Sequence, residues 1–303
     1  VASRGLGDVY KRQVNPISGR GKGRQLARKI NRYFSTKSID FEIHFTQNQG
    51  HATDLAKRII HQNPKTIIAC GGDGTINEVA QTLIGTGIPL GIIPIGSGNG
   101  LASHLDIPKN NLQAFEVILQ QFTMPIDVGK VNDYYFFSNI GFGIDAAVIH
   151  QYSKKTTRNF LGYTLASCKA LLKYRAKKFH TCINQQTNKE QDYFFLFCSN
   201  SNEAGYGISF TPDAKINDHQ LNFLEVKKLN FFEQILFSLH VLTRRLDKMK
   251  QVSQQTIQQL EIITDESEIL AQIDGEAVIF PTNKISISVA PEALKVILPK
   301  KLS

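Results

Sequence analysis

The sequence predicts an α/β N-terminal domain with a parallel sheet, followed by a mostly antiparallel, β-rich C-terminal domain. From residue 14 to about residue 120, short apolar runs alternate with amphipathic stretches, the pattern of a helix-covered parallel sheet. Beyond residue 123, short aromatic and β-branched runs dominate, as in antiparallel strands. We therefore expect domains at 14–122 and 123–303, and the last strand can return to the first domain. The 303 residues suffice for two hydrophobic cores.

The elements of the first domain follow from periodicity. Residues 40–46 alternate apolar and polar side chains, which predicts a half-buried strand, and residues 51–62 carry a helical apolar stripe. The apolar runs at 66–70 and 90–94 predict buried parallel strands, and each ends in a glycine-rich loop. Ligands of such sheets bind beyond the carboxyl ends of the strands, so both loops fall at the expected ligand edge.

The second domain is predicted from four aromatic or β-branched runs and two helical stretches. The helical stretches cover about 159–176 and 230–246. The expected strands are 134–137, 193–197, 221–226 and 285–289.

Composition limits the partners. The formal charge of +9 favours an anionic partner, namely a nucleotide, a nucleic acid or an acidic lipid headgroup. Nucleic acid ranks lowest, because the charge is spread along the chain and no aromatic-basic recognition motif occurs. The four cysteines form no CxxC pair, and we find neither a bilayer-spanning apolar run nor a secretory signal. We therefore expect a cytoplasmic protein.

The strongest local motif is Cys70-Gly-Gly-Asp-Gly-Thr-Ile-Asn-Glu78, where a buried strand turns into a helix. Glycines let backbone N–H groups approach a phosphate at the positive end of the helix dipole. Asp73 lies inside this loop and is suited to hold Mg²⁺ against a nucleotide. Thr75 and Glu78 also have capping-box spacing, so a nucleotide role and a structural role both stay open for Glu78.

Two further loops resemble the first in chemistry. Ile93-Pro-Ile-Gly-Ser-Gly-Asn-Gly100 follows a buried strand and offers glycine, serine and asparagine donors. Asn15-Pro-Ile-Ser-Gly-Arg-Gly-Lys-Gly23 is expected at the exit of the first strand. Either loop alone is a weak signal. Three such loops at one sheet edge indicate phosphate binding.

The ordered set of motifs resembles the diacylglycerol kinase catalytic-domain family, which includes bacterial lipid kinases and the sphingosine and ceramide kinases. Gly141-Phe-Gly-Ile-Asp145, Ile273-Asp-Gly-Glu276 and the segment 291–299 continue the match, which covers the chain from Val14 onward. NAD kinases and phosphofructokinases share the middle motif, so only the ordered set is specific. The resemblance implies an NAD kinase/diacylglycerol kinase-like fold and ATP-dependent transfer of a phosphoryl group to a lipid hydroxyl, with Mg²⁺.

The resemblance also implies roles for individual residues. Asp274 and Glu276 match a bacterial carboxylate pair that deprotonates the lipid hydroxyl, whereas the sphingosine kinase branch assigns this role to the position of Asp73. Asp73 is also the implied metal ligand, and Asp145 the implied contact to the substrate headgroup. From the residues alone, Asp274–Glu276 is better described as a β-turn, and Asp145 equally as a helix cap. The implied ATP-binding residues are Asn15, Ser18, Gly19, Gly71, Gly72, Gly74, Thr75, Glu78, Gly96, Ser97, Gly98 and Asn99.

Two departures from the family pattern keep alternatives open. Gly100 stands where bacterial members usually carry an aspartate of their metal network, and Asn217-Asp-His-Gln-Leu221 replaces the usual Asp-Asp-Gly-Leu turn. A catalytically silent nucleotide- or lipid-binding regulator and an NAD kinase-like enzyme are the alternatives. The substrate, whether diacylglycerol, a sphingoid base, ceramide or an undecaprenol-like alcohol, stays open, as does the oligomeric state. The stretch 159–178 could contact an anionic membrane, although packing on its own domain is the preferred interpretation.

The first thirteen residues are similar to translated sequencing adaptor, and residues 8–13 resemble a transposon mosaic end. We therefore expect the natural chain to enter near Val14, with its first strand missing or replaced. A genuine short basic N-terminus is the alternative. Residues 1–13 are left out of the site predictions.

Overall fold

The computed structural model describes residues 10–14, 23–37, 39–96, 98–153, 174–187, 190–203 and 208–300. The chain forms two compact units, one made of the residues up to Ile126 together with those from Glu292, the other of Asp127–Pro291. The chain passes between them within the strands β5 (Thr123–Val131) and β16 (Lys284–Ile297).

The first unit contains a parallel sheet with the strand order β2-β1-β3-β4-β16. Its strands are β1 (Tyr10–Val14), β2 (Phe41–Phe45), β3 (Thr66–Gly71), β4 (Leu90–Pro94) and the end of β16. All pairings are parallel, including that of Val296 with Leu90. The order reverses between β1 and β3, and such a switch point is where open α/β sheets bind ligands.

The strand β1 includes residues that the sequence analysis left out of the site predictions. Tyr10–Val14 pairs in parallel with both β2 and β3, with Tyr10 opposite Phe41 on one side and opposite Thr66 on the other. The sequence led us to expect a first strand that is missing or replaced, and residues 10–13 supply most of an interior strand at that place. A strand with hydrogen-bonded neighbours on both sides cannot be removed without exposing two strand edges.

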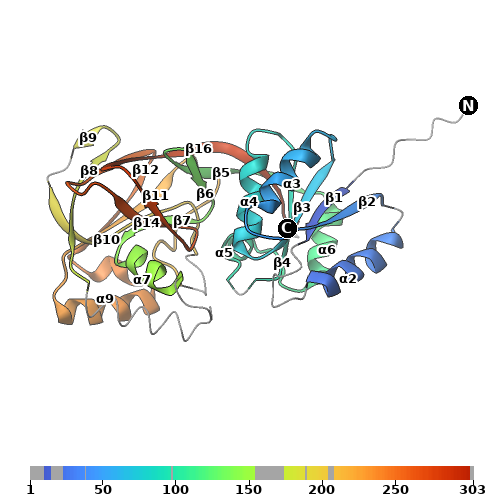
Figure 1. Ribbon diagram of the computed structural model, residues 1–303. Coiled ribbons are helices and arrows are strands. Elements are labelled where there is room, and N and C mark those ends of the chain that lie inside the picture. Colours follow the sequence, from blue (N-terminus) through green and yellow to red (C-terminus); the bar gives the residue numbers. More distant parts are fainter. Residues whose placement is uncertain are drawn as a thin grey trace, which may run out of the picture. The chain divides into compact units, whose positions relative to one another are not determined.

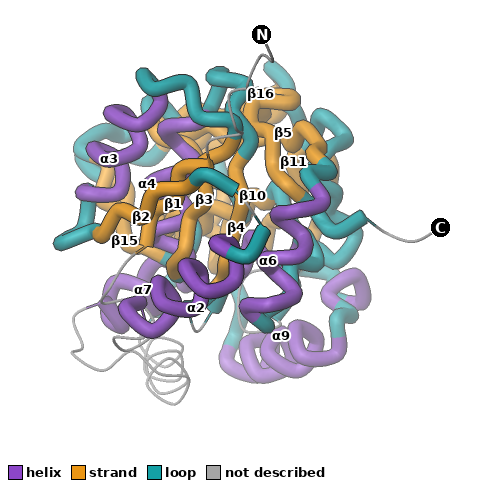
Figure 2. The backbone as a smooth tube through the Cα atoms, turned by 90° about the vertical axis from the view of Figure 1, so that its right-hand side faces the viewer, coloured by secondary structure: helices purple, strands orange, loops and turns teal. Residues whose placement is uncertain are grey.

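Helices cover both faces of this sheet (Figures 1 and 2). The helices α2 (Gly23–Ser35) and α6 (Asn111–Gln120) lie on one face, and α3 (His51–Ile60) and α4 (Asp73–Leu83) lie on the other. Phe34 of α2 and Phe115 of α6 pack edge-to-face in the core between α2, α6, β3 and β4. A short helix, α5 (Gly100–His104), follows β4. The strands and the helix predicted in this domain are confirmed, with ends shifted by one or two residues.

The second unit is built on antiparallel strands. The strand β10 lies between β7 and β11 for most of its length, β14 pairs with β7 and β15, and β13 lies between β8 and β16. A large apolar core contains residues from most of these strands. The strands not yet given are β6 (Tyr134–Phe136), β7 (Asn139–Gly143), β8 (Lys177–Ile183), β9 (Gln186–Thr187), β10 (Gln191–Ser199), β11 (Leu221–Lys227), β12 (Val252–Ile257), β13 (Gln259–Ile263), β14 (Ile269–Ile273) and β15 (Glu276–Phe280).

Helices α7 (Ile144–Ser153) and α9 (Phe231–Thr243) pack on a second core, which includes Phe194 of β10 and Leu224 of β11. A 3-10 turn, η1 (Leu246–Lys248), follows α9. The helix predicted at 230–246 is confirmed. The stretch predicted at 159–176 lies outside the described residues except for 174–176, which are not helical. None of the helices within the described ranges is both long and apolar enough to cross a bilayer.

Candidate functional site

The two predicted glycine-rich loops of the first unit touch each other through their backbones. Gly72 follows β3 and Gly96 follows β4, and these strands are neighbours. A Cβ built on Gly96 would lie 2.6 Å from the Cα of Gly72, and one built on Gly72 would lie 3.3 Å from the Cα of Gly96. The contact at Gly96 therefore requires glycine. Close packing of the loops is a second reason for glycine, beside the approach to phosphate predicted from sequence.

Asp73 connects these two loops. Its Oδ2 accepts a hydrogen bond from the backbone N–H of Asn99 and its Oδ1 one from the N–H of Gly100, both at 2.8 Å. Hydrogen bonds from N–H groups to a carboxylate are among the stronger ones in proteins. The first contribution of Asp73 is thus to hold the end of β4 and the start of α5 against the start of α4.

Asn99 completes the third motif. Its side chain bonds to both backbone groups of Gly96, accepting from the N–H at 3.0 Å and donating to the carbonyl at 2.8 Å. Asn99 is buried and has a left-handed backbone with φ of 57°, a conformation that asparagine tolerates. Ser97 lies outside the described residues. Gly98 adjoins Asp73, because a Cβ there would lie 2.9 Å from Oδ2.

The remaining residues of the Gly-Gly-Asp-Gly motif form the start of α4. The helix begins at Asp73 with Gly72 as its N-cap, so Gly74 and Thr75 are in its first turn. Gly71 packs against Thr75, whose side chain leaves no room for a Cβ on the glycine. The motif therefore presents the amino end of α4 beside the loop after β4, as a phosphate site requires.

Glu78 has a structural role different from the one considered in the sequence. Its carboxylate accepts hydrogen bonds from the N–H groups of Gly50 and Ala52, at 2.9 and 3.0 Å, where α3 begins. The capping box with Thr75 is wrong, because α4 begins before Thr75. Glu78 instead satisfies the amino end of the neighbouring helix. The nucleotide contact predicted for Glu78 stays a prediction.

The predicted loop at residues 15–23 comes after β1 in the sequence. Val14, the last residue of β1, is opposite Cys70, the residue before Gly71. Asn15, Ser18 and Gly19 themselves lie outside the described residues.

In the second unit, Asp274 is held by three main-chain donors. Its Oδ1 accepts from the N–H groups of Ser138 and Asn139, at 2.8 and 2.9 Å, and its Oδ2 accepts from that of Phe137 at 2.9 Å. Asp274 and Gly275 both have positive φ, 48° and 85°, as in the two-residue Asp-Gly hairpin turn between β14 and β15. The β-turn expected from the residues alone is therefore present, with the added role of anchoring the segment before β7.

Glu276 begins β15 just after this turn and is exposed. The hairpin thus carries two carboxylates, a half-buried one at Asp274 and an exposed one at Glu276.

Asp145 lies in the first turn of α7. The carboxyl keeps partial exposure to solvent, yet protein atoms surround it closely, and this burial raises the pKa of Asp145 to about 7, against the opposing effect of a hydrogen bond from Gln272. Gly141 makes room for the carboxyl, since a Cβ there would lie 2.3 Å from its Oδ2. Because Gln272 is next to the Asp274 hairpin, two motifs that are far apart in sequence lie together in this unit. Asp145 is inside the helix and is not its N-cap.

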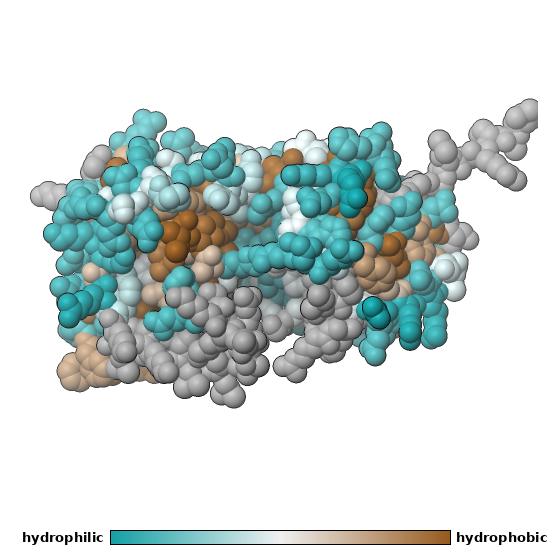
Figure 3. Space-filling model, in the orientation of Figure 1, coloured by the Kyte–Doolittle hydropathy of each residue, from teal (hydrophilic) through white to brown (hydrophobic). Residues whose placement is uncertain are grey.

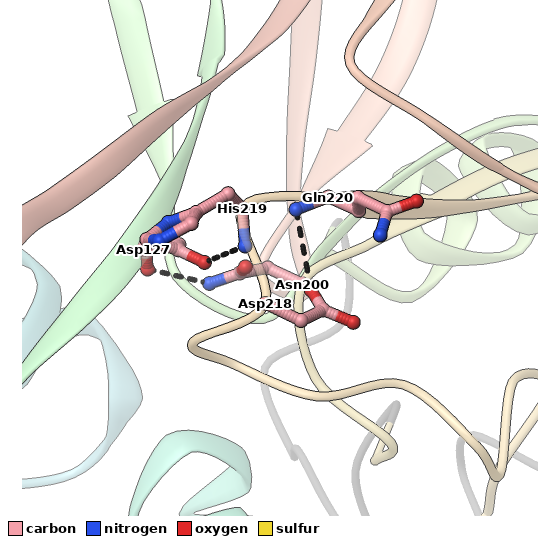
Figure 4. Close-up of polar contacts among 5 residues, drawn as sticks. All are labelled: Asp127, Asn200, Asp218, His219 and Gln220. Carbon is pink, nitrogen blue, oxygen red and sulfur yellow. Dashed lines mark hydrogen bonds and ion pairs between the residues drawn. The ribbon is translucent and has the colours of Figure 1, made fainter.

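The structure adds a buried acid that the sequence analysis missed. Asp127 of β5 is buried, and its carboxylate accepts from the backbone N–H of His219 at 2.6 Å and lies 3.1 Å from the Nδ1 of the same residue (Figure 4). Asn200 donates to the carbonyl of Asp127 at 2.7 Å. His219 has a positive φ of 61°, a conformation that glycine favours. The signal in the sequence is an aspartate inside an apolar strand.

The described residues offer no ready-made metal centre: across them, no three His, Cys, Asp or Glu side chains come together as a metal site. Each oxygen of Asp73 accepts a main-chain hydrogen bond, and a carboxylate oxygen offers a further lone pair, so this carboxylate could still hold a cation. The role of Asp73 as a metal ligand stays a prediction.

Comparison with known proteins identifies the family. Residues 13–131 match the diacylglycerol kinase catalytic domain, and residues 138–298 match the YegS C-terminal NAD kinase beta sandwich-like domain. The chain therefore belongs to the diacylglycerol kinase catalytic-domain family of lipid kinases, with a YegS-type C-terminal domain. The resemblance found in the sequence and the predicted fold class are both confirmed.

Among individual proteins, the chain is 29% identical over 291 residues to a probable lipid kinase YegS-like of Yersinia enterocolitica, covering 93% of this chain and 95% of that protein. It is 30% identical over 226 residues to a diacylglycerol kinase of Bacillus subtilis, covering 73% and 74%. A putative diacylglycerol kinase structure from Bacillus anthracis superposes with a TM-score of 0.81 at 22% identity, over 98% of this chain and 97% of that one. An NAD kinase from Archaeoglobus fulgidus in complex with ATP gives a TM-score of 0.56 at 13% identity over 96% and 94%, which indicates a shared fold.

Proposed function

We propose that this chain transfers the γ-phosphoryl group of ATP to the hydroxyl of a lipid of the diacylglycerol or sphingoid type. Membership of a lipid kinase family supports kinase activity for this chain. One observation above all supports a nucleotide site in the first unit. Gly72 and Gly96 pack closely at the carboxyl edge of the parallel sheet, and Asp73 links their two loops by hydrogen bonds. This arrangement gathers backbone N–H groups and the amino end of α4 in one place, which suits a polyphosphate.

In the proposed reaction, the lipid hydroxyl oxygen forms a bond to the γ-phosphorus while the bond from that phosphorus to the bridging oxygen of ADP breaks. The hydroxyl proton passes to a carboxylate. We assign this proton to Glu276, whose exposed position at the start of β15 leaves it accessible to a substrate. Asp274 then positions the hairpin that carries Glu276. Asp145 is proposed to contact the polar head of the lipid.

Magnesium is proposed to enter with ATP. Mg²⁺ in kinases is commonly bound by substrate phosphates, waters and one or two carboxylates, so a dedicated protein cage is unnecessary. We further propose that the enzyme acts on the cytoplasmic side of an anionic membrane, where its lipid acceptor would reside.

The test is transfer of radiolabel from γ-labelled ATP to a panel of lipids in mixed micelles with Mg²⁺. The panel holds diacylglycerol, a sphingoid base, ceramide and an undecaprenol-like alcohol. Label in one lipid class is expected. Glu276→Gln should abolish it while the unfolding transition is unchanged.

Two alternative functions predict different results. Nucleotide binding without transfer to any lipid would favour a silent regulator, and transfer to NAD in a parallel reaction would favour an NAD kinase-like enzyme. The NAD reaction is included because of the fold shared with the Archaeoglobus fulgidus NAD kinase.

A further inference from the structure

Helix α9 of the second unit is apolar on two opposite faces. One face packs on the core through Phe237, which is buried, and Val241, one turn further on. The other face holds six large apolar residues that the fold leaves exposed. These are Phe231 at 57%, Phe232 at 80%, Ile235 at 48%, Leu236 at 46%, Leu239 at 55% and Leu242 at 76% exposed.

The helix itself is well defined at its amino end. Asn230 caps it by accepting from the N–H of Glu233, and the Glu233 carboxylate accepts from the N–H of Asn230 in return. At 3.6 residues per turn, positions 231, 235, 239 and 242 form one stripe, and 232 and 236 widen it. The result is a continuous apolar strip along the whole helix. Hydrophobic residues gather over α9 at the lower left of Figure 3.

Contiguous exposed apolar surface of this kind marks an interaction site, because water-soluble surfaces normally carry such residues singly. Phe237 and Val241 attach the helix to the core, and the six exposed residues lie outside this contact. Its six residues lie on one helix, whereas a stable protein interface takes about 20–30 residues a side. A narrow apolar strip on a single helix suits insertion into a bilayer interface better than a second copy of the chain.

The cationic residues that follow the apolar strip indicate a bilayer with anionic headgroups. The helix ends at Thr243, and the next seven residues include four cations and one acid, all exposed. The cations are Arg244, Arg245, Lys248 and Lys250. An open hollow beside the helix is lined by Leu236, Leu239, His240, Thr243 and Arg245, which combines apolar walls with a cation at its rim. An apolar helix face followed by cations is the chemistry of an interfacial helix on anionic lipid.

We propose that α9 docks this protein on an anionic lipid bilayer, with the exposed face of α9 among the acyl chains and the cations of 244–250 at the headgroup phosphates. The proposal deepens the proposed function, because a lipid acceptor in a membrane requires the enzyme to reach its surface. Bilayer binding is measured without ATP, so the two proposals can fail separately.

The first experiment is co-sedimentation of the full chain with vesicles of equal parts phosphatidylglycerol and phosphatidylcholine, compared with pure phosphatidylcholine. Phe232→Ala/Leu242→Ala should weaken binding to the anionic vesicles by roughly 30-fold or more, from the apolar area withdrawn. The matched control is Leu112→Ala/Phe122→Ala, one leucine and one phenylalanine that are 56% and 44% exposed in the other unit, which should leave binding unchanged. Arg244→Gln/Arg245→Gln should weaken binding about 20-fold at low salt and little at high salt.

The second experiment reports the depth of α9 directly. The chain contains no tryptophan, so Phe232→Trp supplies a single reporter. Its emission should shift to the blue on anionic vesicles and be quenched by lipids brominated in the acyl chain, whereas Leu112→Trp should show neither effect.

Four results would overturn the proposal. They are unchanged binding of the α9 double variant, equal binding to both vesicle compositions, no quenching of the tryptophan at 232, and a dimer in sedimentation velocity that the α9 double variant abolishes. Vesicle binding through α9 without phosphorylation of any lipid would refute the proposed kinase and leave this proposal standing. Lipid phosphorylation in micelles with no bilayer binding would refute docking through α9 and leave the proposed kinase standing.

Discussion

Replacing Asp274 by asparagine tests whether this carboxylate is first a structural anchor. Asparagine tolerates the left-handed backbone of position 274, where φ is 48°, so the hairpin turn itself is preserved. An amide has one acceptor oxygen, which can keep the N–H groups of Ser138 and Asn139. Its NH₂ group then faces the N–H of Phe137 and leaves that donor unsatisfied.

The cost follows from these three bonds. Losing a charge-assisted hydrogen bond costs about 1.5–3 kcal/mol, and changing two others from charged to neutral acceptors costs about 1 kcal/mol each. The sum of roughly 3–5 kcal/mol is a large part of the stability of one domain. With an unfolding slope of about 2–3 kcal/mol per molar urea, the midpoint of the affected transition should fall by about 1–2 M.

The assay is urea unfolding followed by far-UV circular dichroism, because the chain has no tryptophan to report by fluorescence. Glu276→Gln, two residues away and exposed, is the control and should unfold within about 0.5 kcal/mol of the parent. An unchanged midpoint for Asp274→Asn would refute the anchoring role. A loss of kinase activity in this variant would then have to be chemical.

Three further predictions follow from the structure. Gly96→Ala should weaken ATP binding at least tenfold, measured by isothermal titration calorimetry, and should weaken it more than Gly72→Ala does. The reason is that the new Cβ would lie 2.6 Å from a backbone atom at position 96 but 3.3 Å from one at position 72. Equal losses of affinity in the two variants would contradict this. For Asp145, burial raises the pKa from 3.8 to about 7, so its ionisation disfavours the folded state above the unfolded pKa, increasingly up to about pH 7. Asp145→Asn should therefore stabilise the protein by roughly 2–4 kcal/mol at pH 8 and by little at pH 4, in thermal melts at both values, and a pH-independent difference would refute the shift. Deleting residues 1–13 should abolish cooperative unfolding of the first unit, because residues 10–13 supply most of an interior strand; a deletion variant with the parent's melting temperature would show that β1 is dispensable.

The sequence by itself determined the elements and the class of site. Apolar runs that end in glycine, such as 66–70 and 90–94, indicate buried parallel strands because period and composition are local properties. The order of the loops along the chain was enough to find the family. The helix at 230–246 was likewise found from local pattern. The strand at residues 10–14 carries no apolar run of its own, so its pairing with β2 and β3 is visible only in the structure.

Only the tertiary structure decided what the individual polar side chains do. The partners of Asp73 are 26 and 27 residues away, and those of Asp274 are 135 to 137 residues away. Glu78 caps a helix that precedes its own, and His219 binds the buried Asp127 across 92 residues. A hydrogen bond depends on positions and directions in space, which the spacing of residues along the chain does not fix.

The same reason applies to α9. Its sequence is apolar around most of the helix, so periodicity alone could not tell which face packs on the core. In the folded unit, the face with Phe237 packs on the core and the face with Phe232 is exposed. Which apolar residues face water is a property of the assembled fold, because burial is decided by what the other elements cover.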